Sequence, residues 1–337
     1  MCRKLFFVFI LQFFCKAFYS QDIHFSQYEQ APLLLNPALT GNCEGDWRAG
    51  INFREQWTAT TIPYNTFNIF FDKKVFLYSK VIMVGGYLML DQLNTDGLTK
   101  VSFAPSVAYR VNYRKNILTF GMQPGFGFYN LNKVLTHPDQ FNYETGTFDS
   151  ELPTDDLSEN NSKLFPDINL GISWSRSVYG LSPFVGFAMY HLNSPKISIY
   201  DDENKSRLPV KTILNFGMPI GISSRIYVSP TALLIRQRKS QEVDLGADGT
   251  FRLSKNSVNI ENVCIGIHYR NARSEGLNSV VFIGGLKYNK LNFTISYDEY
   301  FNTLNYSSLL GESFEISIIY TGLSSLTDKF SIPCETY

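Results

Sequence analysis

The residues best suited to chemistry in this sequence are its four histidines, which lie far apart along the chain: His24, His137, His191 and His268. A zinc site would show a close repeat such as His-Glu-x-x-His, and a serine hydrolase would show a Gly-x-Ser-x-Gly turn; the sequence has neither. A Ser-His pair assembled from separate segments stays open, with His191 and Ser194, or His268 and nearby serines, as candidates. Because no feature marks an activated nucleophile, we predict no catalytic residue and no enzyme.

Carboxylates gather at two places, Asp155-Asp156 and Asp244 with Asp248-Gly249. Neither group has the spacing of a full calcium cage, so turn and loop roles are favoured. No phosphate-binding Gly-rich loop occurs, and we expect neither a metal nor a cofactor. The 30 basic residues balance the 30 acidic residues, which gives no electrostatic basis for binding nucleic acid.

The first residues, 1–20, have the three parts of a secretory signal peptide. Arg3 and Lys4 form the positive region, and the apolar run 5–14 is too short to cross a bilayer as a helix. Cleavage after Ala17 satisfies the small-x-small rule, whereas cleavage after Ser20 follows a bulky residue two positions earlier; both sites stay open. The signal predicts export from the cytoplasm.

Three cysteines follow the predicted signal peptide: Cys43, Cys264 and Cys334. An odd number in an exported protein leaves at least one thiol unpaired. No Cys-x-x-Cys motif indicates a redox or zinc site, and the sequence does not assign a pairing.

The elements that position these residues are repeated runs of about ten residues, rich in Phe, Tyr, Val, Ile and Thr and closed by turn formers. No run after the leader approaches the length of an apolar transmembrane helix. We predict about 14 strands, an even number as in bacterial barrels. They are Trp47–Trp57, Phe67–Asp72, Lys80–Asp91, Val101–Tyr113, Ile117–Asn130, Asp167–Arg176, Leu181–His191, Lys211–Ser223, Ile226–Arg236, Val243–Leu253, Val263–Tyr269, Val280–Tyr288, Leu291–Tyr297 and Phe314–Tyr320.

Alternation within these runs predicts two different faces. In Phe314–Tyr320 the even-numbered positions are aromatic or aliphatic, and the odd-numbered positions include Glu315 and Ser317. A soluble β-sandwich would bury the apolar face, and a membrane barrel would turn it to lipid. The 28 Phe and 20 Tyr, the scarcity of charges within strands and the strand lengths favour an all-β, antiparallel β-barrel of the outer membrane.

Two segments interrupt this rhythm. Residues 136–165 are polar, acidic and rich in turn formers, and a shorter segment of the same kind spans 199–209. Long loops of a barrel belong on the extracellular side. We therefore predict a signal peptide, a lead-in or plug segment over 21–45, and one barrel domain over 46–337.

Several motifs resemble one known family. Phe25-Ser26-Gln27-Tyr28 and Asn36-Pro37-Ala38-Leu39-Thr40-Gly41 are the most specific, and Arg54, Gln56 and Trp57 look like its Arg-x-Gln-Trp element. His191 and Pro195 stand as in its His-Leu-x-x-Pro segment, and Glu315 lies in a segment like its last strand. The sequence thus resembles the PorP/SprF family, the outer-membrane proteins of type IX secretion in Bacteroidota.

This resemblance implies a role in protein export and gliding motility, by assisting the export, capture or anchoring of surface proteins such as adhesins. The implied partners are translocon components, the C-terminal signal domain of a secreted protein, periplasmic lipoproteins and the lipid bilayer. It also favours Gln21 as the first residue of the mature chain. A passive solute channel is the alternative.

Two of these motifs also invite a physical interpretation. Asn36-Pro37 with Thr40-Gly41 has turn chemistry, and it could form a plug in the barrel mouth or only lead into the first strand. Arg54, Glu55 and Gln56 could meet Glu315 in a network inside the barrel, because the first and last strands pair when a barrel closes. A solvated face is the other interpretation.

Overall fold

The protein is described by a computed structural model. It describes residues 22–57, 63–77, 80–93, 97–131, 140–143, 145–149, 152, 162–178, 181–198, 206–253, 260–272, 277–302 and 312–323. The predicted signal peptide, His137, Asp155-Asp156 and Cys334 lie outside these residues.

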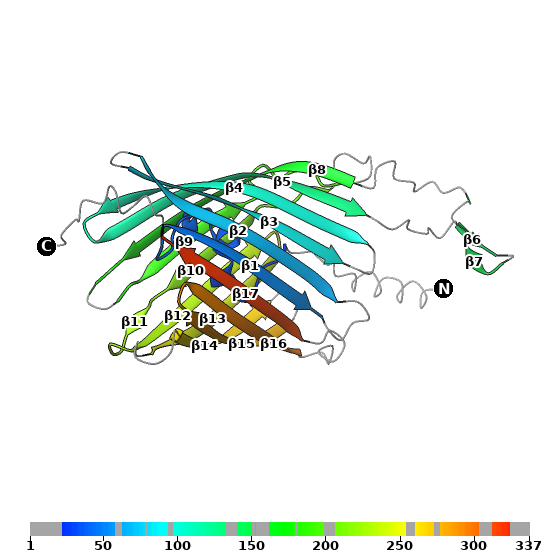
Figure 1. Ribbon diagram of the computed structural model, residues 1–337. Helices are drawn as coiled ribbons and strands as arrows, with labels where there is room; N and C mark the ends of the chain where they lie inside the picture. Colours follow the sequence, from blue (N-terminus) through cyan, green and yellow to red (C-terminus); the bar gives the residue numbers. More distant parts are fainter. Residues whose placement is uncertain are drawn as a thin grey trace, which may run out of the picture.

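Within the described residues, 14 antiparallel strands form a closed barrel (Figure 1). Each strand pairs with the next along the chain, β5 pairs with β8, and β1 pairs with β17. The two-residue β11 continues the line of β10, and both pair with β12. The strands are β1 Trp47–Gln56, β2 Tyr64–Leu77, β3 Lys80–Leu93, β4 Leu98–Tyr113, β5 Asn116–Leu131, β8 Ser162–Arg176, β9 Phe184–Tyr190, β10 Lys211–Gly217, β11 Ile220–Gly221, β12 Ile226–Gln237, β13 Ser240–Arg252, β14 Ile260–Ala272, β15 Leu277–Tyr288, β16 Leu291–Asn302 and β17 Ser313–Gly322. The predicted fold class and number of strands are confirmed.

The barrel exposes apolar side chains on its outer face and buries polar side chains inside, which is the reverse of a soluble protein. Phe103 and Phe282 are 50% exposed on the outer face, whereas Asn68, Gln123 and Asn169 are buried inside. In β17 the polar Glu315 is buried and its apolar neighbours are turned outward, as the alternation predicts. No helix in the described part of the chain is long and apolar enough to cross a membrane.

The two ends of the barrel differ. The end where β1 starts and β17 stops has tight turns such as residues 114–115 and 289–290, and we name it the short-turn end. The opposite end carries the connection 132–161 between β5 and β8, and we name it the long-loop end. That connection contains a small hairpin, β6 Phe141–Asn142 and β7 Thr147–Phe148 (Figure 1). Because β8 begins at Ser162, the last residues of the predicted loop belong to a strand.

Residues 22–46, here named the inner segment, run inside the barrel, where Figure 1 draws them in dark blue. The segment contains three short helices, η1 Tyr28–Gln30, α2 Pro32–Leu35 and η2 Pro37–Leu39. A proline opens α2 and η2, where its fixed φ suits the first helical position. Helices α2 and η2 are therefore single turns that start at a residue with the required backbone preference.

The buried hydrophobic residues lie between the inner segment and the wall. Leu33 packs with Phe70 and Tyr87 of β2 and β3, and Leu35 packs in a second cluster that includes Ile213 of β10. Burying a side chain of this size stabilises the packed state by about 1.5–3 kcal/mol. The segment therefore supplies the apolar centre that the polar inner wall lacks.

Candidate functional site

The first described residue, Asp22, is fixed to three parts of the wall at the long-loop end. Its carboxylate accepts from Lys100 of β4 at 2.7 Å and contacts His191 Nε2 at 2.5 Å. Its backbone N–H donates to Gln237 of β12 at 2.8 Å. The other ring nitrogen of His191 contacts Asp167 of β8 at 2.8 Å. We name these five residues the latch.

At the latch, burial and the neighbouring charges shift the pKa values of Asp22 and His191 in opposite directions. Burial raises the pKa of the Asp22 carboxyl, but Lys100 and His191 outweigh this effect and hold that pKa well below its usual value. Burial lowers the pKa of His191, but Asp22 and Asp167 raise it overall. The charged imidazolium is therefore favoured between its two carboxylates.

One carboxylate holds the backbone of the Phe25-Ser26-Gln27-Tyr28 motif, and side-chain bonds from Ser26 to Asp298 and from Tyr28 to Thr231 add to it. Glu315 of β17 accepts from the backbone N–H groups of Ser26 at 2.5 Å and Gln27 at 2.9 Å. Arg54 of β1 donates to Glu315 at 2.8 Å and to the carbonyl of His24 at 2.7 Å. The structure thus brings Arg54 and Glu315 together across the seam where β1 pairs with β17.

A chain of buried charges extends from this pair along the wall. Asp298 of β16 lies 3.6 Å from Arg54 and 3.2 Å from Arg270 of β14. Arg270 lies 3.2 Å from Glu242 of β13, which contacts His24 at 2.8 Å. Side chains of β1, β13, β14 and β16 thus form a buried network of opposite charges that contacts the inner segment at His24. Such pairing offsets the cost of desolvating the charges.

The Asn36–Gly41 turn packs against the opposite wall. Asn36 donates to the carbonyl of Ile172 in β8 at 3.1 Å, and its own side-chain oxygen accepts from Ala38 N–H at 2.8 Å. Thr40 bonds the carbonyl of Pro37 at 2.7 Å and the hydroxyl of Ser106 in β4. The Asn36 side chain therefore caps η2 while it holds the turn to the wall.

The turn ends at Gly41, whose φ of 66° lies in the left-handed region that glycine tolerates. Its N–H donates to Asp72 of β2 at 2.9 Å, and Asp72 also pairs with Arg48 at 2.5 Å. The wall beneath the turn has Gly121, because a Cβ there would overlap the backbone of Pro37 and Ala38.

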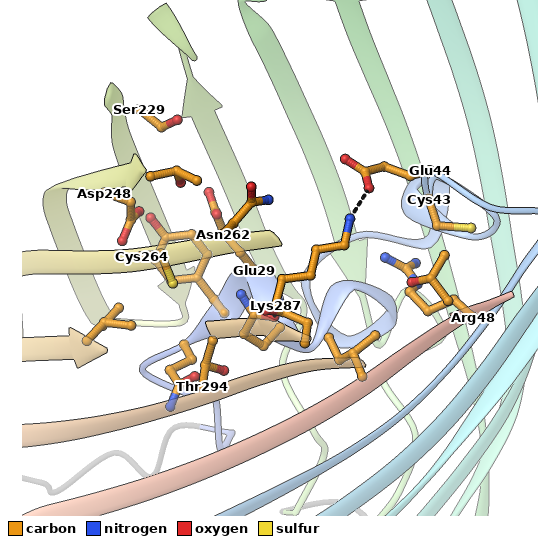
Figure 2. A pocket seen from close by; sticks show the side chains of 18 of the residues that line it. Glu29, Cys43, Glu44, Arg48, Ser229, Asp248, Asn262, Cys264, Lys287 and Thr294 are labelled. Carbon is orange, nitrogen blue, oxygen red and sulfur yellow. Dashed lines mark hydrogen bonds and ion pairs between the residues drawn. The ribbon is translucent and has the colours of Figure 1, made fainter. Parts of the chain in front are cut away.

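A polar cavity of about 380 Å³ remains between the inner segment and strands β12 to β17, and we name it the chamber. Figure 2 shows Glu29, Asp248 and Thr294 around this space, together with the Lys287–Glu44 pair. Most of its wall residues, such as Arg48, Lys287 and Thr321, lie near the strand ends at the short-turn end, and the chamber reaches inward to His268.

Other predicted site residues lie away from these contacts. Gln56 pairs in register with Ser313 and Tyr64 near the long-loop end, and the Trp57 ring packs against Tyr64. The Pro195 carbonyl accepts from the N–H of Leu208 at 2.9 Å. Glu55 cannot join the Arg54 network, because neighbouring residues of β1 face opposite sides and Glu55 pairs with the outward Phe314.

The histidines considered for chemistry are engaged by carboxylates. His191 lies between Asp22 and Asp167, and the Ser194 contact to His191 is made by its backbone N–H. His268 Nδ1 lies 2.9 Å from Asp244, and its Nε2 lies 3.3 Å from Asp248. Within the described residues, no group of His, Cys, Asp and Glu is arranged to hold a metal ion.

Sequence reasoning missed Asp22, Lys100, Arg270 and Asp298. The last three each lie one residue beyond the end of a predicted strand and inside the longer strands of the structure. Extending the predicted alternation by one residue would have found them as charged residues at inward positions. Asp22 had no signal of its own, since its contacts join residues far apart in the sequence.

Comparison with known proteins gave similar solved structures and one family. No curated protein matches the chain. Among solved structures, the chain is similar to the CymD monoaromatic hydrocarbon channel, with 11% identity, a TM-score of 0.49, and coverage of 88% of this chain and 93% of that one. It is also similar to the toluene transporter TbuX of Ralstonia pickettii, with 11% identity, a TM-score of 0.48, and coverage of 86% and 92%.

The family comparison is more specific. Residues 17–320 match the family described as type IX secretion system membrane protein PorP/SprF. The match spans the inner segment, its contacts with the wall, and the barrel up to Tyr320 in β17. The chain therefore belongs to the PorP/SprF family of type IX secretion system membrane proteins and is a β-barrel of the outer membrane.

Proposed function

We propose that this barrel assists type IX secretion by docking or anchoring exported surface proteins, including adhesins used in gliding motility, and does not conduct them through its lumen. The observation that carries the proposal is the inner segment, which crosses the lumen and bonds to opposite walls through Glu315 and Asn36. A passing polypeptide would have to displace it.

The cost of displacement supports this role. Moving the segment out would separate Ser26 and Gln27 from Glu315, and Asp22 from Lys100 and His191. Hydrogen bonds to charged groups contribute about 1.5–3 kcal/mol each. Several such bonds break together when the segment moves as a unit, so the lumen is a poor conduit.

Docking surfaces remain at both ends. In bacterial barrels long loops face the exterior and short turns face the periplasm. The connection 132–161 would meet an exported protein or its C-terminal signal domain, and its hairpin exposes 88% of Tyr143 and 53% of Phe148. The short-turn end would meet translocon components or periplasmic lipoproteins.

The test uses full-length tagged protein in a bacterium that carries a type IX system. We replace residues 132–161 with a flexible linker of equal length, and in a matched control we replace the short turn 114–115. Chemical crosslinking and purification from the outer membrane then identify partners. Loss of a secreted surface protein in the loop variant alone supports docking at the outer end.

If neither a secretion component nor an exported protein copurifies with the intact barrel, the docking role is wrong. The alternative, a passive solute channel, predicts stable single-channel conductance of the wild-type protein in planar bilayers. We expect low conductance that rises when residues 22–42 are removed.

A further inference from the structure

We propose that the chamber binds a primary ammonium group, carried by a lysine side chain of a partner that enters from the periplasm. The inference goes beyond the secretion role and does not depend on it. It rests on the charge balance, the uncompensated polar atoms and the shape of the chamber.

The chamber is lined by three carboxylates and three basic side chains, and two of the basic side chains also pair with carboxylates outside the lining, Asp72 and Asp244. The basic residues that line the chamber already have carboxylate partners: Arg48 pairs with Asp72, Lys287 lies 2.7 Å from Glu44, and His268 lies between two aspartates. Glu29 projects from η1 into the chamber and has no ion-pair or hydrogen-bond partner among the described residues. The chamber is therefore suited to a cation and not to an anion.

Two buried polar atoms also point to a ligand. Gln27 and Thr294 line the chamber and are only 4% and 1% exposed. The Gln27 side-chain oxygen and the Thr294 hydroxyl have no hydrogen-bond partner in the described part of the chain. A buried polar group without a partner costs about 1–3 kcal/mol. A donor in the chamber would remove that cost once these side chains turn toward it.

An ammonium group fits these acceptors better than a metal ion does. It has three donors and no acceptor, and Glu29, Gln27 and Thr294 offer one carboxylate, one amide oxygen and one hydroxyl. A divalent ion would need clustered ligands, and the described residues contain no such cluster.

The chamber also has a place for an alkyl stem. Ile283 and Ile319 line it together with the polar groups, so methylenes can pack there while the charged end reaches Glu29. Glu44, which lines the chamber beside Lys287 (Figure 2), is 81% exposed, so the chamber is open to solvent at the short-turn end. A lysine side chain has the required combination of a stem and a terminal ammonium.

The test measures binding of Nα-acetyl-lysine methylamide to the full-length barrel in detergent micelles, by calorimetry or NMR. Glu29→Gln removes the charge and keeps the shape, and we expect it to weaken binding by about 10-fold to 100-fold. The matched control is Glu55→Gln, the same substitution on the outer face of β1, and it should leave binding unchanged. Heat-modifiable gel mobility verifies that each variant is folded.

Further probes separate the sources of the ammonium group. The Nε-acetylated compound should not bind, and butylamine should bind more weakly than the lysine compound. Equal or tighter binding of butylamine would overturn the assignment to a peptide side chain in favour of a free amine. Equal binding of the Nε-acetylated compound, or full affinity in Glu29→Gln, would overturn the ammonium site itself.

Discussion

Replacement of Glu315 by alanine should release the Ser26–Gln27 region of the inner segment without opening the barrel. Glu315 is 1% exposed, pairs with Arg54, and accepts from the Ser26 and Gln27 N–H groups. Removal of one partner from a buried ion pair costs about 3–5 kcal/mol. The barrel ladder between β1 and β17 uses backbone groups and is preserved.

The expected increase in local opening of the inner segment follows from this free-energy cost. At 1.4 kcal/mol for each factor of ten, local opening becomes more frequent by about 100-fold to 4,000-fold. Hydrogen exchange followed by mass spectrometry reports it as faster exchange in a peptide that contains Ser26 and Gln27. The protein is studied as the full barrel in detergent micelles.

A surface ion pair provides the control. Glu44 is 81% exposed where it pairs with Lys287, so Glu44→Gln should change exchange at Ser26 by no more than about fivefold, because exposed pairs contribute under about 1 kcal/mol. If Glu315→Ala leaves exchange at wild-type level while the folded barrel migrates normally on gels, Glu315 does not hold the segment and the reasoning fails.

The remaining predictions concern the packing of the inner segment against the wall and the pH dependence of the latch and of ligand binding. Gly121→Ala should push the turn at Pro37 off the wall at a cost of about 1–3 kcal/mol, seen as faster exchange there, whereas Gly284→Ala meets no atom closer than 4.0 Å and should be neutral. Because the pKa of His191 is raised above 6.5, its stabilisation of the latch should be complete below pH 6.5 and lost as pH rises through the raised pKa. Hydrogen exchange at the latch, corrected for the intrinsic exchange rate, should show this step, and His191→Gln should remove it. Desolvation inside the barrel and the nearby Asp248 and Asp244 of β13 raise the pKa of Glu29 to about 7, although its side chain borders the open chamber, and His268 of β14 opposes them. The affinity of the lysine probe should therefore rise from pH 6 to pH 8, and a flat profile would contradict the role of Glu29.

The sequence predicted the barrel because the information on strands is local. Alternation in β16 and β17 identifies both faces without knowledge of neighbouring strands, since successive side chains always point to opposite sides. Turn residues at the strand ends then determine the number of strands. The same rule, applied residue by residue, would have separated Glu55 from Arg54.

The route of the inner segment was not predictable in this way. The contact between Ser26 and Glu315 joins positions 289 residues apart, and it exists only because closure brings β1 beside β17. The Asn36–Gly41 motif predicts a turn, but turn chemistry does not specify which wall the turn meets. The space beneath it is visible only in the structure, where Gly121 admits Pro37.

The motifs near the start of the chain therefore stabilise the closed barrel by bonding the inner segment to several of its strands. Glu315 and Arg54 belong to the last and first strands, and the segment bonds to both while Asn36 bonds to β8 on the opposite wall. A barrel with an open seam would not present these partners together. The inner segment can settle only after closure, and once settled it adds buried contacts that an open sheet cannot form. Changes in the motif should thus impair retention of the segment before they impair the strand ladder.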